Sequence, residues 1–330
     1  MILDDSDTTS HSTMMVEQLN LRHYSEISET DVGSLPSYLS HLWIGPSFGL
    51  QTSVSAIVAS IPVHLQQLDM DLNRMSFDWD VCISLLQRLH KLTKLCLRFI
   101  GEEWALAVAQ ALPHTQSLEC LDVRGNRIGD TGLEAIVKAF VDNPTKMSVR
   151  HVMLSWNNLT VKGVTALARY LEQDTCVLEN LDLSCNTSIG DDSVDELCRA
   201  LKSNTSLVEL NLFCCPNISN AGAAAISECL EQHNTTLQCL NLQACHKLSH
   251  DSIQQVQYWT AMNRVGRRIF RDDTVGDALW ADILARCYRS RPTGTSKRYS
   301  SASGSSFISA SDKVYFLIRH KVDLIAKGGI

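Results

Sequence analysis

One pattern of leucines and asparagines recurs along more than half of this sequence. The segment 121–140, LDVRGNRIGDTGLEAIVKAF, opens with alternating apolar residues, as in a half-buried strand, and closes with apolar residues at helical spacing. This segment belongs to a frame LxxLxLxxN that starts at residues 65, 92, 118, 149, 178, 207 and 237, so that successive copies are 26 to 31 residues apart. The copy that starts at residue 92 is weaker, because Ile100 stands in place of the asparagine. Such regular spacing predicts a repeat array in which each unit is a strand, a turn and a helix.

Stacking of the units decides the fold class. A single strand–turn–helix unit cannot bury its own apolar face, whereas stacked neighbours share a continuous core. The second half of each unit supplies the matching helical stripe, for example Leu133, Ile136 and Phe140 or Val194, Leu197 and Leu201. The pattern therefore predicts an α/β solenoid, a horseshoe with parallel strands on the concave face, helices on the convex face and a helical C-terminal cap.

The ninth position of the frame is expected to be structural. An asparagine there turns the chain away from the strand, and its amide can bond backbone groups of the turn that would otherwise be buried without a partner. Cysteine replaces it in the last two units, where a small thiol suits a buried site. The predicted structural turn positions are Asn73, Asn126, Asn157, Asn186, Cys215 and Cys245.

The seven copies resemble the leucine-rich repeat family, in particular its long, ribonuclease-inhibitor-like class, over about residues 65 to 250. The later repeats, LDLSCNTSIGDDS, LNLFCCPNISNAG and LNLQACHKLSHDS, lean towards the cysteine-containing class of F-box adaptors. Their loops carry one extra residue. The resemblance implies a horseshoe that binds protein partners.

The ends of the chain differ from the repeats in amino-acid composition. Residues 1–35 are rich in Ser, Thr, Asp and Glu and are expected to be disordered, and residues 36–64 to form an N-terminal cap or degenerate repeat. The repeats are expected to occupy residues 65–253. Residues 254–330 are expected to form the helical C-terminal cap, interrupted by a Ser-rich loop at 289–311.

Composition narrows the class of partner and the compartment. The net charge of -7 provides no basic field for nucleic acid, and no apolar run is long enough to cross a membrane. The first residues lack the features of a secretory signal, so the twelve cysteines are expected to be reduced thiols of a cytoplasmic protein, with the nucleus as the alternative. We expect a monomer.

The motifs and ligand spacings of the sequence predict neither catalysis nor a metal site. In the densest group of potential ligands, Cys214, Cys215, Cys239, Cys245, His246 and His250, the cysteines follow the repeat length and form no CxxC pair of a zinc site. Walker A, HExxH and Rossmann motifs are absent, and the short stretch GPSFG at residues 45–49 has the letters of GxSxG without a further motif that would supply a base and an orienting acid. The sequence therefore predicts a protein that is not an enzyme and has no cofactor.

The strand face that does not enter the core is the candidate binding surface. The third, fifth and seventh positions of each frame should face the concave side and the eighth its rim. These positions mix charges with aromatic residues and methionine, which are favoured at protein interfaces. The predicted contact residues are Arg98, Phe99, Asp122, Arg124, His151, Met153, Trp156, Asp182 and Phe213.

The predicted function is protein recognition as a non-enzymatic scaffold or adaptor, with a protein partner whose identity the sequence does not contain. Two alternatives remain open at this point. One is a substrate adaptor of a ubiquitin ligase, which the cysteine-type repeats favour although no F-box is visible before residue 65. The other is a GTPase-activating protein of the leucine-rich-repeat type, which would need polar groups at one rim.

Overall fold

The computed structural model describes residues 17–22, 35–45, 58–71, 79–98, 103–144, 148–264 and 266–267. Within these residues, nine strands form one parallel sheet in which each strand pairs with the next along the chain. The strands are β1 (Gln18–Asn20), β2 (His41–Ile44), β3 (Gln67–Asp71), β4 (Lys94–Arg98), β5 (Cys120–Asp122), β6 (His151–Met153), β7 (Asn180–Asp182), β8 (Glu209–Asn211) and β9 (Cys239–Asn241).

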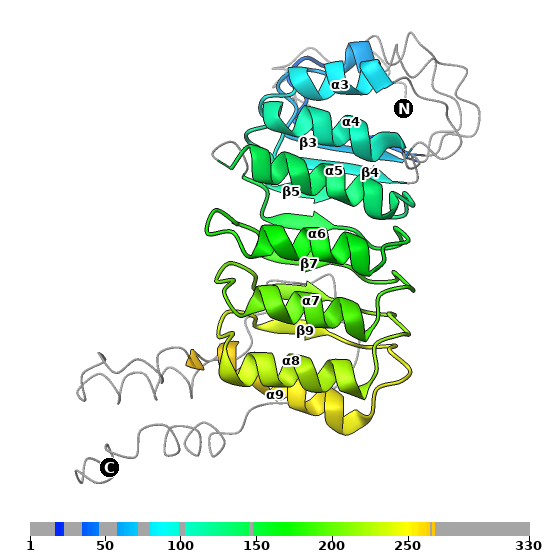
Figure 1. Ribbon diagram of the computed structural model, residues 1–330. Coiled ribbons are helices and arrows are strands. Elements are labelled where there is room, and N and C mark those ends of the chain that lie inside the picture. The colour runs from blue at the N-terminus through cyan, green and yellow to red at the C-terminus, as the bar shows by residue number, and fades with distance from the viewer. Residues whose placement is uncertain are drawn as a thin grey trace, which may run out of the picture.

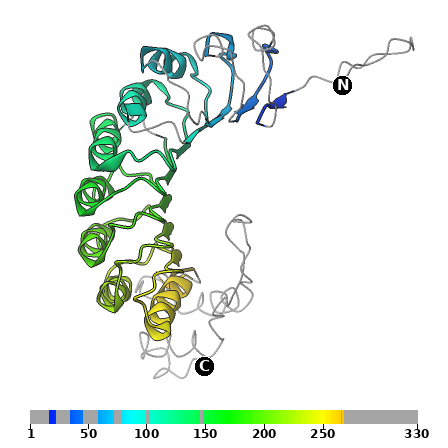
Figure 2. The same cartoon turned by 90° about the vertical axis from the view of Figure 1, so that its right-hand side faces the viewer.

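Helices alternate with the strands from β3 onwards and stack over one face of the sheet (Figure 1). Figure 2 shows the stack in profile as an arc, with the strands along its inner side and the helices on its outer side. The described helices are α3 (Trp79–Arg88), α4 (Glu103–Ala111), the short 3-10 helix η1 (Leu112–His114), α5 (Gly129–Asp142), α6 (Val161–Leu171), α7 (Asp191–Leu201), α8 (Asn220–Gln232) and α9 (His250–Arg264). The predicted α/β solenoid is confirmed.

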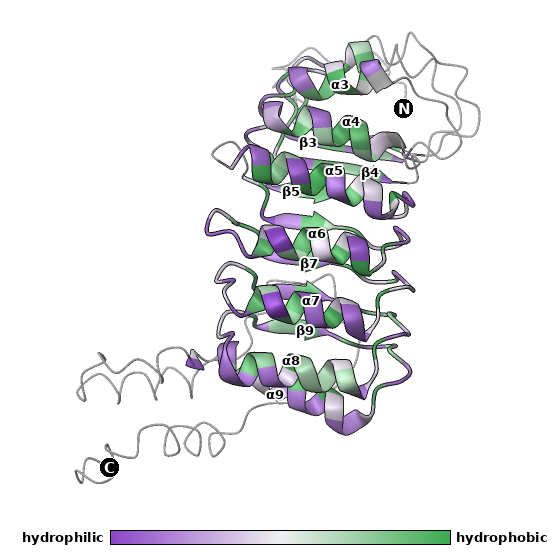
Figure 3. Ribbon diagram, viewed as in Figure 1, coloured by the Kyte–Doolittle hydropathy of each residue, from purple (hydrophilic) through white to green (hydrophobic). Residues whose placement is uncertain are grey.

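The register of the sheet places the same frame position of successive repeats side by side. Leu68 pairs with Leu95, Leu95 with Leu121, and Leu121 with Val152. Together with the apolar side of each helix, these rows form one continuous buried core. In Figure 3, hydrophilic and hydrophobic residues interleave along each helix, as expected for helices that bury only one side.

The sheet extends beyond the seven repeats towards the N-terminus. Strand β2 coincides with the degenerate repeat expected within 36–64, and β1 pairs with it in parallel. Strand β1 thus lies inside the segment 1–35 that the sequence predicts to be disordered. Of the segment 1–35, the structure describes only residues 17–22 and Leu35.

At the other end, the predicted boundary at residue 253 falls within α9. This helix packs on α8 as the helix of the seventh repeat and buries Val256 and Met262. Most of the predicted cap, including the Ser-rich loop 289–311, lies outside the described residues.

A ladder of buried asparagines joins the turns of successive repeats. Asn157 donates from Nδ2 to the carbonyl of Val123, 2.9 Å away in the preceding repeat. Its Oδ1 accepts the backbone amides of Asn126 and Ile128 at 3.0 and 3.3 Å. Asn186 repeats the arrangement one unit later. These side chains are therefore committed to the fold, as the sequence predicts, whereas Asn73 lies outside the described residues.

Cysteine keeps part of this arrangement in the last two repeats. Cys215 and Cys245 are buried, and their Sγ atoms approach the carbonyls of Leu183 and Leu212 at 3.7 and 3.3 Å. The thiol thus takes the place of the amide as the group that faces the carbonyl of the preceding repeat. Burial raises the pKa of the Cys215 thiol to about 12, so this side chain stays protonated and apolar in character.

A second set of asparagines, which the sequence did not reveal, occupies the turn from helix to strand. Asn204 and Asn234 are buried, and each donates to a carbonyl of the preceding repeat at 2.8 Å. Each also accepts two amides of its own turn, and Asn263 continues the series from α9. Both ends of every strand in this part of the array are therefore tied to the neighbouring repeat.

Candidate functional site

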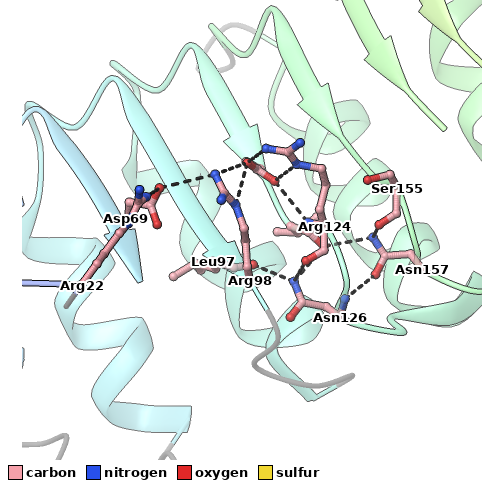
Figure 4. A network of polar contacts seen from close by, with 10 residues as sticks. Arg22, Asp69, Leu97, Arg98, Arg124, Asn126, Ser155 and Asn157 are labelled. Carbon is pink, nitrogen blue, oxygen red and sulfur yellow. Dashed lines mark hydrogen bonds and ion pairs between the residues drawn. The ribbon is translucent and has the colours of Figure 1, made fainter. Parts of the chain in front are cut away.

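The concave face of the N-terminal repeats carries a chain of ion pairs, which we call the arginine–aspartate ladder. It consists of Arg22, Asp69, Arg98, Asp122 and Arg124, which alternate in charge across strands β1 to β5 (Figure 4). Arg98 extends from the end of β4 to both sides. Its Nη2 lies 3.4 Å from Asp69 and 3.1 Å from Asp122.

The arginines of the ladder cover its carboxylates. The side chains of Asp69 and Asp122 are only 8% and 3% exposed, whereas those of Arg22, Arg98 and Arg124 are 29–32% exposed. Cys96 lies buried between the two aspartates on β4, and burial together with their negative charges raises the pKa of its thiol to about 12. The surface that the ladder offers to solvent is therefore made of guanidinium groups.

Asp122 is held ionised by its neighbours. Burial alone would raise the pKa of its carboxyl group, but the hydrogen bonds from Arg124 and the charges of Arg124 and Arg98 lower it below the ordinary value. Arg124 donates from Nε and Nη2 to the two carboxylate oxygens at 2.8 and 2.7 Å, which is a bidentate pair.

The aspartates at the fifth frame position also end the strands. Asp122 and Asp182 each accept the backbone amide two residues later, at 3.2 and 3.0 Å, and Asn211 and Asn241 do the same in the next repeats. This Asx-type turn needs a short oxygen-bearing side chain close to the backbone. Both side chains are also buried, so they hold the turns instead of lining the contact surface as the sequence predicts. Asp122 in addition holds Arg98 and Arg124.

Among the described residues of the candidate surface, Trp156 has the most exposed large apolar side chain, at 63%. It occupies the eighth frame position, and its φ of 59° lies in the left-handed region, which is unusual for a bulky residue. The equivalent residues of the neighbouring repeats, Gly125 and Cys185, share the left-handed backbone, and both have small side chains. The indole is thus held outward at the rim, flanked by small residues.

The other predicted contact residues lie on the central strands. His151 and Met153 are half-buried on β6, and Phe213, after β8, is 37% exposed. Arg98 and Arg124 lie two and one repeats before Trp156. Phe99 lies outside the described residues. The structure therefore brings Arg98, Arg124, His151, Met153 and Trp156 onto adjacent strands.

The left-handed backbone at Trp156 predicts an unusual order of stability. Glycine adopts a φ of 59° without strain and alanine does not, so Trp156→Gly should be more stable than Trp156→Ala by about 1 kcal/mol, or roughly 2–4 °C in melting temperature. Thermal unfolding followed by circular dichroism measures the difference. At Phe213, which has no positive φ, the order should reverse. Equal melting temperatures at Trp156 would contradict the left-handed turn.

Part of the array matches a sequence model of a known repeat. A sequence model described as "Leucine Rich repeat" matches residues 114–137, 145–168, 176–198 and 203–227, four successive units of the array seen in the structure. The chain contains leucine-rich repeats. The matches coincide with the strand–turn–helix units around β5 to α8.

Several curated proteins resemble this chain over its repeats. The bovine Tonsoku-like protein is 27% identical over 219 residues, which cover 63% of this chain and 15% of that protein. The human NACHT, LRR and PYD domains-containing protein 14 is 29% identical over 222 residues (57% of this chain, 20% of that protein). The human centrosomal protein of 78 kDa is 29% identical over 197 residues (53% and 28%). The chain thus matches less than a third of the length of each relative.

A solved structure supports the architecture. In the crystal structure of the yeast Rad7 and Elc1 complex, one chain superposes with a TM-score of 0.52 at 17% identity, over 74% of this chain and 60% of that chain. At this identity the likeness concerns the fold alone. Among the described residues there is no group of three or more His, Cys, Asp or Glu side chains that could hold a metal ion. No described helix is long and apolar enough to span a bilayer.

Proposed function

We propose that this leucine-rich repeat protein is a non-enzymatic scaffold or adaptor that binds a protein partner on its concave face, with the partner engaging the region from the arginine–aspartate ladder to Trp156. The observation that carries the proposal is the placement of Trp156. A tryptophan held outward on a strained backbone, beside a row of arginines, combines the two residue types that contribute most to protein interfaces.

Physical chemistry supports a partner of protein type. An exposed indole contributes to affinity by burying apolar area in a partner's pocket, and the neighbouring arginines steer and orient the complex. Relatives with the same repeats are large proteins in which this region is one part, which fits a recognition module.

Affinity capture with the whole chain as bait, followed by mass spectrometry, tests the proposal. We expect Trp156→Gly to weaken the affinity for the captured partner by about thirtyfold, the effect of removing an interface hot spot, while the fold is retained. Lys138→Glu and Arg169→Glu, exposed on the convex helices α5 and α6, are the matched controls and should bind normally. Loss of the partner in these controls, with normal capture by Trp156→Gly, would place the interface on the convex face.

A further inference from the structure

We infer that the arginine–aspartate ladder recognises an acidic, extended segment of the partner protein. The inference rests on the proposed function and adds the chemistry of the segment bound. Its basis is the different exposure of the two charges: three guanidinium groups are about a third exposed, while the carboxylates that pair with them are almost fully covered. A partner approaching the concave face therefore meets hydrogen-bond donors.

The charges around the ladder leave a local positive excess. The described charged groups on β3 to β5 and at the ladder's ends are four cations, Arg22, Lys94, Arg98 and Arg124, against three carboxylates, Asp69, Asp71 and Asp122. Four minus three gives a net charge of +1, in a chain whose overall charge is -7. This patch is thus a local exception on an acidic protein, and a partner carboxylate would balance it.

Arg98 is the centre of the patch. It bonds Asp69 and Asp122 through Nε and Nη2, and no hydrogen bond of its Nη1 is found among the described residues. The two aspartates hold the guanidinium in a fixed orientation over Cys96. A pre-oriented guanidinium loses little freedom when it binds a carboxylate, and such charge-assisted bonds are the strong ones.

The dimensions fit a short stretch of extended chain. From β1 to β5 the ladder crosses four strand spacings, roughly 19 Å at about 4.8 Å each. An extended peptide rises about 3.3 Å per residue, so about six residues span this distance. Nucleic acid is disfavoured because its binding needs many neutralised phosphates, whereas the patch has an excess of one positive charge and the whole chain is acidic.

Fluorescence anisotropy with labelled heptaglutamate, heptaglutamine and a thymidine heptamer tests the inference at low salt. The wild-type chain should bind heptaglutamate, with affinity falling as salt screens the charges, and should not bind heptaglutamine. Arg98→Gln should weaken heptaglutamate binding about tenfold, the change that corresponds to one charge-assisted hydrogen bond. This variant leaves Asp69 paired with Arg22 and Asp122 with Arg124, so its melting temperature should stay close to wild type.

The matched control is Arg199→Gln on α7. Arg199 also bridges two carboxylates, Glu172 and Glu196, but on the convex side, and its loss should leave heptaglutamate binding unchanged. Absent binding of heptaglutamate, equal weakening by both variants, or tighter Arg98-dependent binding of the thymidine heptamer would overturn the inference. A captured partner that depends on Trp156 but not on Arg98 would overturn it while leaving the proposed function intact. A partner insensitive to both residues would refute the proposed function itself.

Discussion

Replacing Asn186 with alanine should lower the free energy of unfolding by about 3 kcal/mol or more. The Asn186 side chain is fully buried and joins two repeats. Its Oδ1 accepts the amides of Asn157 and Leu159 at 2.9 and 3.1 Å, and its Nδ2 donates to the carbonyls of Leu154 and Leu183 at 3.0 and 2.8 Å. Alanine leaves these backbone groups buried without the asparagine, and each such loss costs about 1–3 kcal/mol.

Urea unfolding followed by circular dichroism measures this loss. Asn180→Ala in the same repeat is the control, because Asn180 makes one side-chain bond, to Glu209 at 2.8 Å, in a partly exposed position. Its cost should stay below about 1 kcal/mol. Because repeats unfold semi-independently, the transition of Asn186→Ala should also broaden, as the array separates at the weakened junction. Similar losses in the two variants would contradict a special role for the ninth position.

Much of this architecture is contained in the spacing of the sequence. The frame LxxLxLxxN fixes which residues are buried, and identical frames in neighbouring repeats fix the register of the sheet. The ninth-position asparagines could be predicted because their buried amides must serve the turn backbone. These features recur from one copy of the frame to the next, so the seven copies support the same prediction.

The features that were missed depend on contacts between repeats. Asn204 and Asn234 match the glycosylation pattern, and only the stacked structure shows their amides bonded to the preceding turn. The left-handed backbone at Trp156 was hidden because residues of very different size, from glycine to tryptophan, occupy the eighth position. Gly125 at the same position was the available signal, since glycine favours positive φ.

For the candidate site, the sequence predicted which face the residues lie on but not what their side chains contact. Strand alternation places Arg98, Asp122 and Arg124 on the concave face, and the structure finds them there. Periodicity does not say where a long arginine side chain ends or which carboxylate it covers. The ladder therefore emerged only with the side chains in place, and with it the burial of Asp122, which the sequence predicted as a contact residue.

The second large effect is expected from charge reversal in the ladder. In Arg124→Glu, a carboxylate would face Asp122, whose side chain is 3% exposed, and the bidentate pair at 2.8 and 2.7 Å would be lost. Breaking a buried pair costs about 3–5 kcal/mol, and we expect about 3 kcal/mol because Arg98 still contacts Asp122 and Arg124 is partly exposed. The control Lys138→Glu reverses a surface charge paired with Asp142 and should cost less than about 1 kcal/mol.

The pH dependence identifies the cause of that loss. In the wild type the pKa of Asp122 is lowered by folding, so its stabilising contribution is present above the ordinary value of 3.8 and is lost as pH falls through the folded pKa. In Arg124→Glu the two facing carboxylates raise each other's pKa, and protonation of one relieves the repulsion. The stability gap between wild type and variant, measured by urea unfolding, should therefore narrow from neutral pH towards about pH 4. A gap that stays constant over this range would mean that lost packing of the arginine stem, and not charge, accounts for the effect.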